Sequence, residues 1–302
     1  MRSPPAIMPT IYCFEESAIL ARKTASILHA RCRKIHERRF PDGESLVKVD
    51  KSAAREVVIL RSLDHPDLKL MPTLLAADAL RRAGARNVTL VAPYLAYMRQ
   101  DKIFAPGQPI SQRVIGGILG RYFDRVLTIE AHLHRIQRLS EVVPSRRQSE
   151  SLSAAPAIAD WARASGQDCE DCVIIGPDKE SRPWIEAIAK ASGREFAVGD
   201  KHRTGDRKIR VEFGELRAHR RAIIVDDIAS SGATLAATAQ ALRARGIRAI
   251  DAVVVHAIFA VGALSIIRRG GIRKLVSCDT IAHRTNAISV APLIAKVLAG
   301  AA

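Results

Sequence analysis

Paired acids followed by a run of hydroxyls and small residues mark the segment Ala222–Leu235, which reads AIIVDDIASSGATL. The acids are Asp226 and Asp227, and they follow four apolar residues. Small side chains let backbone N–H groups approach an anion closely, and the N-terminus of a following helix adds unpaired N–H groups and a favourable dipole. The pattern therefore predicts a phosphate-binding loop in which the two acids hold the hydroxyls of a sugar.

The residues expected to cradle the phosphate follow the acids after Ile228 and Ala229. They are Ser230, Ser231, Gly232, Ala233 and Thr234. Their hydroxyls and backbone N–H groups can donate to phosphate oxygens. An ordinary strand–turn–helix with a Ser or Thr cap is the alternative. It accounts for one hydroxyl, but not for paired acids together with three hydroxyls. The segment is not a Walker A loop, because it lacks the GxxxxGK[ST] pattern.

Short β-rich runs alternate with helical patterns along the whole chain, which predicts an α/β fold with mainly parallel sheets flanked by helices. In such sheets ligands bind beyond the carboxyl ends of the strands. The predicted strands are Thr10–Phe14, Val57–Arg61, Val88–Ala92, Arg125–Ile129, Cys172–Gly176, Ala222–Val225, Ala252–Ala257 and Lys274–Ser277. The predicted helices are Ser17–His29, Leu68–Arg82, Ile110–Tyr122, Ala154–Ala164, Pro183–Ala191, Ala233–Arg245 and Val261–Arg269.

A length of 302 residues suggests two domains. The polar stretch Ser145–Ser153 is the best candidate for their boundary, which divides the chain into residues 1–148 and 149–302. Both halves carry a similar series of strand–helix units, so two related α/β domains are expected, in an arrangement that lets the last helix pack back on the first domain.

The charge balance is strongly basic, with 47 Lys and Arg against 31 Asp and Glu and a net charge of +16. Such a balance indicates nucleic acid, an anionic membrane or a small anionic substrate as the partner. Aromatic residues make up only 4%, too few for a platform that stacks single-stranded nucleic acid. The apolar stretch 249–267 contains Asp251 and His256, so it is read as a strand and a helix and not as a membrane span.

The five cysteines are scattered and odd in number, which argues against a disulfide framework and for a cytoplasmic location. The pair Cys169 and Cys172 has no second ligand pair at zinc-site spacing. The N-terminus lacks the apolar core of a signal peptide.

Taken alone, several other polar segments have ordinary explanations. The RFPDGE turn can place Phe40 against a base, with Asp42 and Glu44 toward its amino groups, but Pro-Asp-Gly is also common in tight turns. An isolated Arg-Gln-Asp is usually a solvated turn. Asp178 can simply cap the helix that is predicted to begin near Pro183.

Together these segments resemble a known family. Ala222–Leu235 is similar to the signature of proteins that bind phosphoribosyl diphosphate, which include phosphoribosyltransferases and phosphoribosyl-diphosphate synthetases. Other segments of this chain resemble the synthetases, or ribose-phosphate diphosphokinases, specifically. They are RFPDGE (39–44), APYLAYMRQDKIFAPGQPIS (92–111), TIEAHLHRI (128–136), VIIGPDK (173–179), GDKHRTGDRKIR (199–210) and DTIAHRTNAISVAPLIAKVL (279–298). The resemblance implies two phosphoribosyltransferase-like domains.

Residue roles follow from the resemblance at matching positions. ATP binding is implied for Phe40, Asp42, Glu44, Arg99, Gln100 and Asp101, and the loop that holds the first three is expected to reach the adenine site of a neighbouring subunit. A metal role is implied for His132 and Asp178, whereas His134 has no counterpart in the family. The chain departs from the family pattern in having Glu130 where an Asp is usual, and ESRPW where glycines usually follow Asp178.

Lys201 and Arg203 match the cations that stabilise the transferring β-phosphate in the family, while Lys208 and Arg210 are read as solvated. The implied reaction joins the β,γ-diphosphoryl group of Mg-ATP to O1 of ribose 5-phosphate, with Mg²⁺ required. A phosphoribosyltransferase and a non-catalytic regulatory subunit are the alternatives. The expected partners are ATP, ribose 5-phosphate and further copies of the chain in a homodimer or larger homo-oligomer, with no dedicated nucleic acid and no membrane.

Overall fold

The computed structural model describes residues 8–133, 135–164, 171–204, 208–214, 216–217 and 221–300, with the backbone alone for residues 203, 204, 208 and 209. The chain forms two compact units. One contains the chain up to Leu152 together with the part from Val290 onward, and the other is Ser153–Ser289.

The first unit is built on a six-stranded parallel sheet with the strand order β2-β1-β5-β6-β7-β8. The strands are β1 (Thr10–Cys13), β2 (Cys32–Lys34), β5 (Glu56–Leu60), β6 (Asn87–Ala92), β7 (Arg125–Ile129) and β8 (Glu150–Leu152). A separate antiparallel pair consists of β3 (His36–Arg39) and β4 (Ser45–Lys48). The helices are α1 (Ala18–Ile27), α2 (Pro66–Arg82), α3 (Ser111–Tyr122) and α8 (Ala291–Ala299), with short 3-10 turns η1 (Glu15–Ser17) and η2 (Leu139–Glu141).

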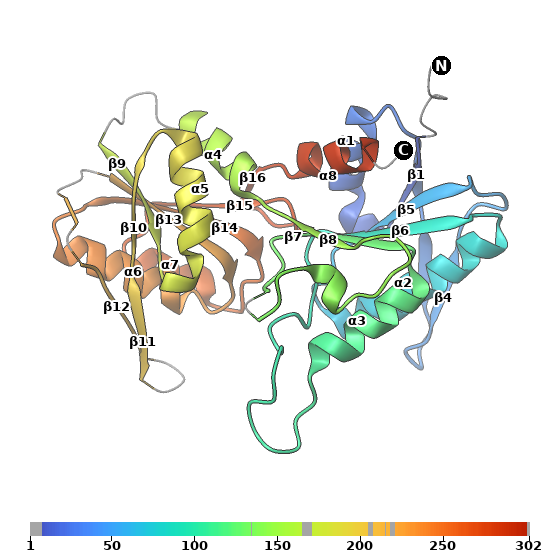
Figure 1. Cartoon of the computed structure of the whole chain (residues 1–302), viewed down its shortest axis with the longest axis horizontal. Helices are drawn as coiled ribbons and strands as arrows, with labels where there is room; N and C mark the ends of the chain where they lie inside the picture. Colours follow the sequence, from blue (N-terminus) through green and yellow to red (C-terminus); the bar gives the residue numbers. More distant parts are fainter. Residues whose placement is uncertain are drawn as a thin grey trace. The chain divides into compact units, whose positions relative to one another are not determined.

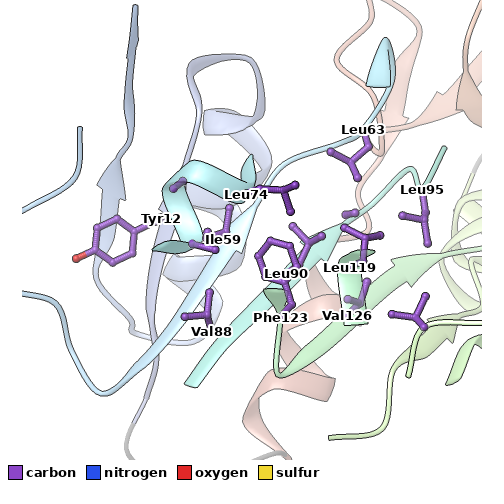
Figure 2. Close-up of a cluster of buried hydrophobic side chains, with 14 of the residues drawn as sticks. Tyr12, Ile59, Leu63, Leu74, Val88, Leu90, Leu95, Leu119, Phe123 and Val126 are labelled. Carbon is purple, nitrogen blue, oxygen red and sulfur yellow. The ribbon is translucent and has the colours of Figure 1, made fainter. Parts of the chain in front are cut away.

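Helices cover both faces of this sheet. The C-terminal helix α8 packs against α1 on one face, and α2 and α3 lie on the other (Figure 1). The core beneath α2 and α3 draws on strands and helices alike, as Figure 2 shows for Ile59, Leu74, Leu90, Leu119 and Phe123. Burial of apolar surface of this kind supplies most of the driving force for folding.

The second unit repeats the plan, with a six-stranded parallel sheet in the order β10-β9-β13-β14-β15-β16. The strands are β9 (Cys172–Gly176), β10 (Glu195–Val198), β13 (Arg221–Ala229), β14 (Ala249–Ala257), β15 (Lys274–Cys278) and β16 (Asn286–Ile288). An antiparallel hairpin is formed by β11 (Asp200–Thr204) and β12 (Lys208–Glu212). The helices are α4 (Ala155–Ala164), α5 (Arg182–Ser192), α6 (Ala233–Ala244) and α7 (Ala263–Arg269), and the 3-10 turn η3 (Lys179–Ser181) precedes α5.

The predicted fold class is confirmed, and every predicted strand and helix has a counterpart within a few residues. The strand predicted at Ala222–Val225 is longer than expected, because β13 continues through both acids to Ala229. The edge strands β2, β8, β10 and β16 were not predicted. They are three or four residues long, too short for a periodic pattern to identify. Among the described helices, none is both long and apolar enough to cross a bilayer.

Candidate functional site

The phosphate site predicted at residues 230–234 comprises the connection 230–232 between β13 and α6 and the first two residues of α6. Ser230 and Ser231 are exposed, and the Oγ of Ser231 accepts a hydrogen bond from the backbone N–H of Ala233 at 3.4 Å. Gly232 caps the helix with φ at +78°, and a Cβ at this position would lie 2.6 Å from Cγ1 of Ile267. Only glycine fits both the left-handed backbone and the contact with α7. The loop is therefore held close to α7 while its hydroxyls face solvent.

The two acids of the motif lie near the carboxyl end of strand β13 and are half-buried. The Oδ1 of Asp226 accepts from the N–H of Asp227 at 3.1 Å, and the Oδ1 of Asp227 accepts from the N–H of Ile228 at 2.7 Å. Burial raises the pKa of Asp226 well above its ordinary value, and the charges of Asp227 and Asp178 raise it further, against the opposing effect of Lys201. Negative charge is crowded at this edge of the sheet, and a bound cation would relieve it.

Asp178 lies at the same edge, because β9 pairs in parallel with β13 and Ile175 is opposite Ile224. One oxygen of its carboxylate, Oδ1, accepts from the N–H of Ser181 at 3.2 Å and so caps the turn η3. The other oxygen, Oδ2, lies 3.3 Å from Nζ of Lys201. The helix-capping alternative from the sequence is thus present in the structure, and it leaves one carboxylate oxygen turned toward a cation.

Lys201 belongs to the hairpin strand β11, and its side chain is only 16% exposed. Arg203 is on the same strand, where it pairs with Ile209, and its side chain lies outside the described residues. The structure therefore brings together Asp178, Lys201, Asp226 and Asp227 within the second unit.

In the first unit, the RFPDGE segment forms the tip of the β3–β4 hairpin. Phe40 and Glu44 close the turn through a backbone hydrogen bond of 2.8 Å, and the Oδ1 of Asp42 accepts from the N–H of Glu44 at 3.1 Å. Gly43 has φ at +94°, which this turn requires of a glycine. The side chains of Asp42 and Glu44 are exposed, and Arg38 lies 5.2 Å from the ring centre of Phe40. The two carboxylates are thus held at a solvent-facing tip beside an aromatic ring.

The Arg99–Asp101 segment leaves β6 and precedes α3. Arg99 is exposed, whereas Gln100 accepts a hydrogen bond from the hydroxyl of Ser111 through its side chain. The Oδ2 of Asp101 lies 3.3 Å from Nε of Arg135, and the Asp101 side chain is 8% exposed. The segment is therefore anchored by its second and third residues while the arginine projects outward.

His132 lies in the loop that follows β7 and is half-buried. The loop leaves the strand through Glu130, whose φ of +41° is unusual for a residue with a side chain. Arg135, three residues after His132, forms the ion pair with Asp101 and so joins this loop to the Arg99–Asp101 segment. His134 lies outside the described residues.

Arg61 is a buried cation that contacts the β3–β4 hairpin, and the sequence pattern did not single it out. The side chain of Arg61 is 4% exposed, and its guanidinium lies 3.6 Å from the ring centre of Phe14. It binds Glu16 at 2.8 Å and Glu37 of β3 at 2.9 Å. The available signal was a charged residue immediately after the apolar strand EVVIL, where polar residues of parallel sheets gather.

Two family models match the chain. Residues 10–121 match the family model described as the N-terminal domain of ribose phosphate pyrophosphokinase, and residues 148–279 match the phosphoribosyl transferase domain. A ribose-phosphate pyrophosphokinase of Methanopyrus kandleri is 30% identical over 285 residues, which cover 94% of this chain and 96% of the relative. One of Maricaulis maris is 32% identical over 293 residues, which cover 92% of each chain.

A solved structure is also similar over almost the full length. The crystal structure of phosphoribosylpyrophosphate synthetase from Mycobacterium smegmatis matches with a TM-score of 0.83 and 22% identity, covering 98% of this chain and 99% of that one. At this identity the likeness supports the fold, while the sequence relatives establish the family.

Proposed function

The chain belongs to the ribose-phosphate pyrophosphokinase family, and we propose that it transfers the β,γ-diphosphoryl group of ATP to O1 of ribose 5-phosphate. The products are phosphoribosyl diphosphate and AMP. The observation that carries the proposal is the pairing of Lys201 with Asp178 at 3.3 Å, at the same sheet edge as Asp226. A cation is thereby held among acids next to a loop suited to phosphate.

We assign the sugar phosphate to the loop and the acids of the second unit. The 5-phosphate would accept from Ser230, Ser231 and Thr234 and from the backbone at the start of α6, where the helix dipole favours an anion. Asp226 and Asp227 would accept from the ribose hydroxyls. This role suits carboxylates whose oxygens lie at the carboxyl end of a buried strand.

Lys201 and Arg203 are assigned to the transferring group. In the proposed reaction O1 of ribose 5-phosphate attacks the β-phosphorus of ATP. The bond between that phosphorus and the oxygen that bridges it to the α-phosphorus breaks, and AMP leaves with this oxygen. Negative charge develops on the diphosphoryl oxygens, so cations fixed before the reaction stabilise the transition state more than the ground state. The low exposure of Lys201 supports this assignment, because a charge shielded from water acts more strongly.

ATP is assigned to the polar segments of the first unit. Arg99 projects from an anchored segment and is available to a phosphate or a base, and Gln100 is held by Ser111. The hairpin tip offers Phe40 for stacking and the carboxylates of Asp42 and Glu44 for an amino group. These assignments place the residues for ATP in the first unit and the residues for the sugar phosphate in the second.

We propose Mg²⁺ as the metal, with a metal-associated role for His132 in the first unit and for Asp178 in the second. Mg²⁺ usually takes only one or two carboxylates and completes its shell with water and substrate phosphates. Asp178 would supply one carboxylate oxygen, Oδ2, which lies 3.3 Å from Nζ of Lys201 in this structure. Among the described residues, no three His, Cys, Asp or Glu side chains lie close enough together to hold an ion by themselves. When bound with ATP, the metal supplies positive charge to the phosphates.

We further propose a homodimer or larger homo-oligomer. The exposed tip with Asp42 and Glu44 belongs to a two-stranded sheet separate from the main one, which suits a loop that serves a neighbouring copy. Light scattering after size-exclusion chromatography tests this, and a monomer at working concentration would contradict it.

The activity is tested by incubating the purified chain with ATP, ribose 5-phosphate and Mg²⁺ and measuring the products by mass spectrometry. The proposal expects phosphoribosyl diphosphate and AMP in equal amounts, and neither product after chelation with EDTA. Absence of both products with Mg²⁺ present would overturn it. Consumption of added phosphoribosyl diphosphate with a nucleobase, without its synthesis, would indicate a phosphoribosyltransferase instead.

A further inference from the structure

Two ion pairs link the loop after β9 to the beginning of β11, and they are arranged in opposite senses. Asp178 pairs with Lys201 at 3.3 Å, and the next residue, Lys179, pairs with Asp200. Each of the two segments thus supplies an acid followed by a lysine: Asp178 and Lys179 after β9, and Asp200 and Lys201 at the start of β11. The first pair is shielded, with side-chain exposures of 16% and 27%, and the second is open to solvent, with 72% and 44%.

The backbones of the two segments also approach closely beside these pairs. The N–H of Gly199 donates to the carbonyl of Gly176 at 2.8 Å. A Cβ on Gly199 would lie 3.0 Å from the carbonyl oxygen of Pro177 and 2.5 Å from Cγ1 of Val211, so the approach requires glycine. Asp178 is itself held by the cap to Ser181. The start of β11 thus packs closely against the loop that follows β9, and the two ion pairs lie beside this backbone contact.

We propose that Lys179 is a positioning residue for diphosphoryl transfer, which acts through Asp200 to hold the start of β11 and so keeps Lys201 beside Asp178. The inference rests on the proposed function, because a role in diphosphoryl transfer requires that the chain catalyses this transfer. Lys179 directly follows Asp178 in the sequence, and no glycine occurs between Asp178 and Gly193.

The charges that face Asp200 support this role. Lys179 donates to its carboxylate and lowers the pKa of Asp200, and His202 lies 3.8 Å away on the same strand. Because both Lys179 and Asp200 are largely exposed, their attraction adds little to global stability. Its effect is therefore expected in the placement of the neighbouring Lys201, where a displacement of about 1 Å can lower a rate a hundredfold.

The kinetic test compares K179Q, D200N, K179R and the charge-swapped double variant K179D/D200K. We expect K179Q and D200N to lower kcat between about tenfold and a hundredfold, with KM for both substrates and Tm near the wild-type values. K179R should retain most of the rate, and the charge swap should recover a large part of it. A matched control is R217Q, which breaks the exposed Arg217–Glu195 pair of the same unit and should leave kcat unchanged.

Two results would overturn the proposal. If K179Q raises KM and the charge swap recovers nothing, Lys179 contacts a substrate directly. If kcat is unchanged in K179Q and D200N, the pair does not position Lys201.

Amide hydrogen exchange provides a readout that does not depend on activity. We expect faster exchange in the peptide that spans Gly199 to Lys201 in K179Q, and wild-type exchange in R217Q. An inactive wild-type protein would refute the proposed function while this measurement still tested the positioning. Unchanged exchange in K179Q would refute the positioning role.

Discussion

Arg61 Nη2 donates to Oε2 of Glu37 across 2.9 Å, which ties the end of the first sheet to the β3–β4 hairpin. The guanidinium is buried against Phe14 and also binds Glu16. Glu37 is three residues before Phe40 at the hairpin tip. A buried cation thus anchors the strand that leads to the proposed base-binding turn.

Replacing Arg61 with Met should strongly destabilise the first unit. The substitution leaves Glu16 and Glu37 without their shared cation. Loss of one partner from a fully buried ionic group typically costs about 3–5 kcal/mol, and we expect about 2 kcal/mol here because the side chains of Glu16 and Glu37 are 35% and 22% exposed. Urea unfolding followed by circular dichroism measures the change, and KM for ATP should rise as the hairpin loosens.

The control for this prediction is Arg82→Gln, since Arg82 pairs with Asp78 on the surface with side-chain exposures of 79% and 55%. Its free energy of unfolding should match that of the wild type within the error of the measurement. Equal stability of the two variants would show that the Arg61 network is dispensable.

Gly232→Ala should weaken binding of ribose 5-phosphate. A Cβ at this residue would lie 2.6 Å from Cγ1 of Ile267 and 3.0 Å from the carbonyl oxygen of Ala263, so the loop must move away from α7. We expect KM for ribose 5-phosphate to rise about tenfold or more, because a loop displaced by about 1 Å no longer aligns its donors.

Gly246→Ala separates backbone strain from this steric effect. Gly246 also has a positive φ, +89°, but a Cβ there would meet nothing within 4 Å. The variant should lose about 1–2 kcal/mol of stability and keep its KM. A similar rise in KM for both variants would contradict the role given to the loop.

Lys201→Ala should abolish most of the turnover without unfolding the protein. Loss of one preorganised charge or donor at a transition state commonly lowers kcat by about 10²–10³. Product formation is measured by mass spectrometry and the fold by circular dichroism. A folded variant with an undiminished rate would exclude Lys201 from the transfer step.

Asp251→Asn should make the second unit less stable in a pH-dependent way. Asp251 is fully buried and accepts from Arg273 at 3.0 and 3.1 Å and from Arg221 at 3.2 Å. Burial alone would raise the pKa of Asp251, but the hydrogen bonds from both arginines outweigh it and lower the pKa. The ionised carboxylate of Asp251 therefore stabilises the fold fully at pH values above the ordinary pKa of Asp. This stabilisation is lost as the pH falls through the lowered pKa of Asp251.

At pH 7 we expect the Asn variant to lose about 3 kcal/mol, and the difference from wild type should shrink as the pH falls below about 4. Urea unfolding of both proteins at a series of pH values from 7 downward measures this difference in the free energy of unfolding. Asp160→Asn is the control, because Asp160 pairs with Arg163 on the exposed face of α4. A difference that grows toward acid would contradict the assigned sign.

The alternation of strand and helix patterns determined the fold class from the sequence alone, since each pattern depends only on residues close in the chain. The prediction of a phosphate site at residues 222–235 also came from spacing, because its acids, hydroxyls and small residues are neighbours in sequence. The length of β13 was underestimated, as its last residues are polar and carry no strand periodicity.

Only the tertiary structure decided which charges meet. Arg61 and Glu37 are 24 residues apart, and Lys179 and Asp200 are 21 apart. Whether such residues touch depends on strand order and register, which bring distant segments to the same edge of a sheet. The last helix was expected to pack back on the first domain, and the structure shows its partner there, because α8 packs against α1.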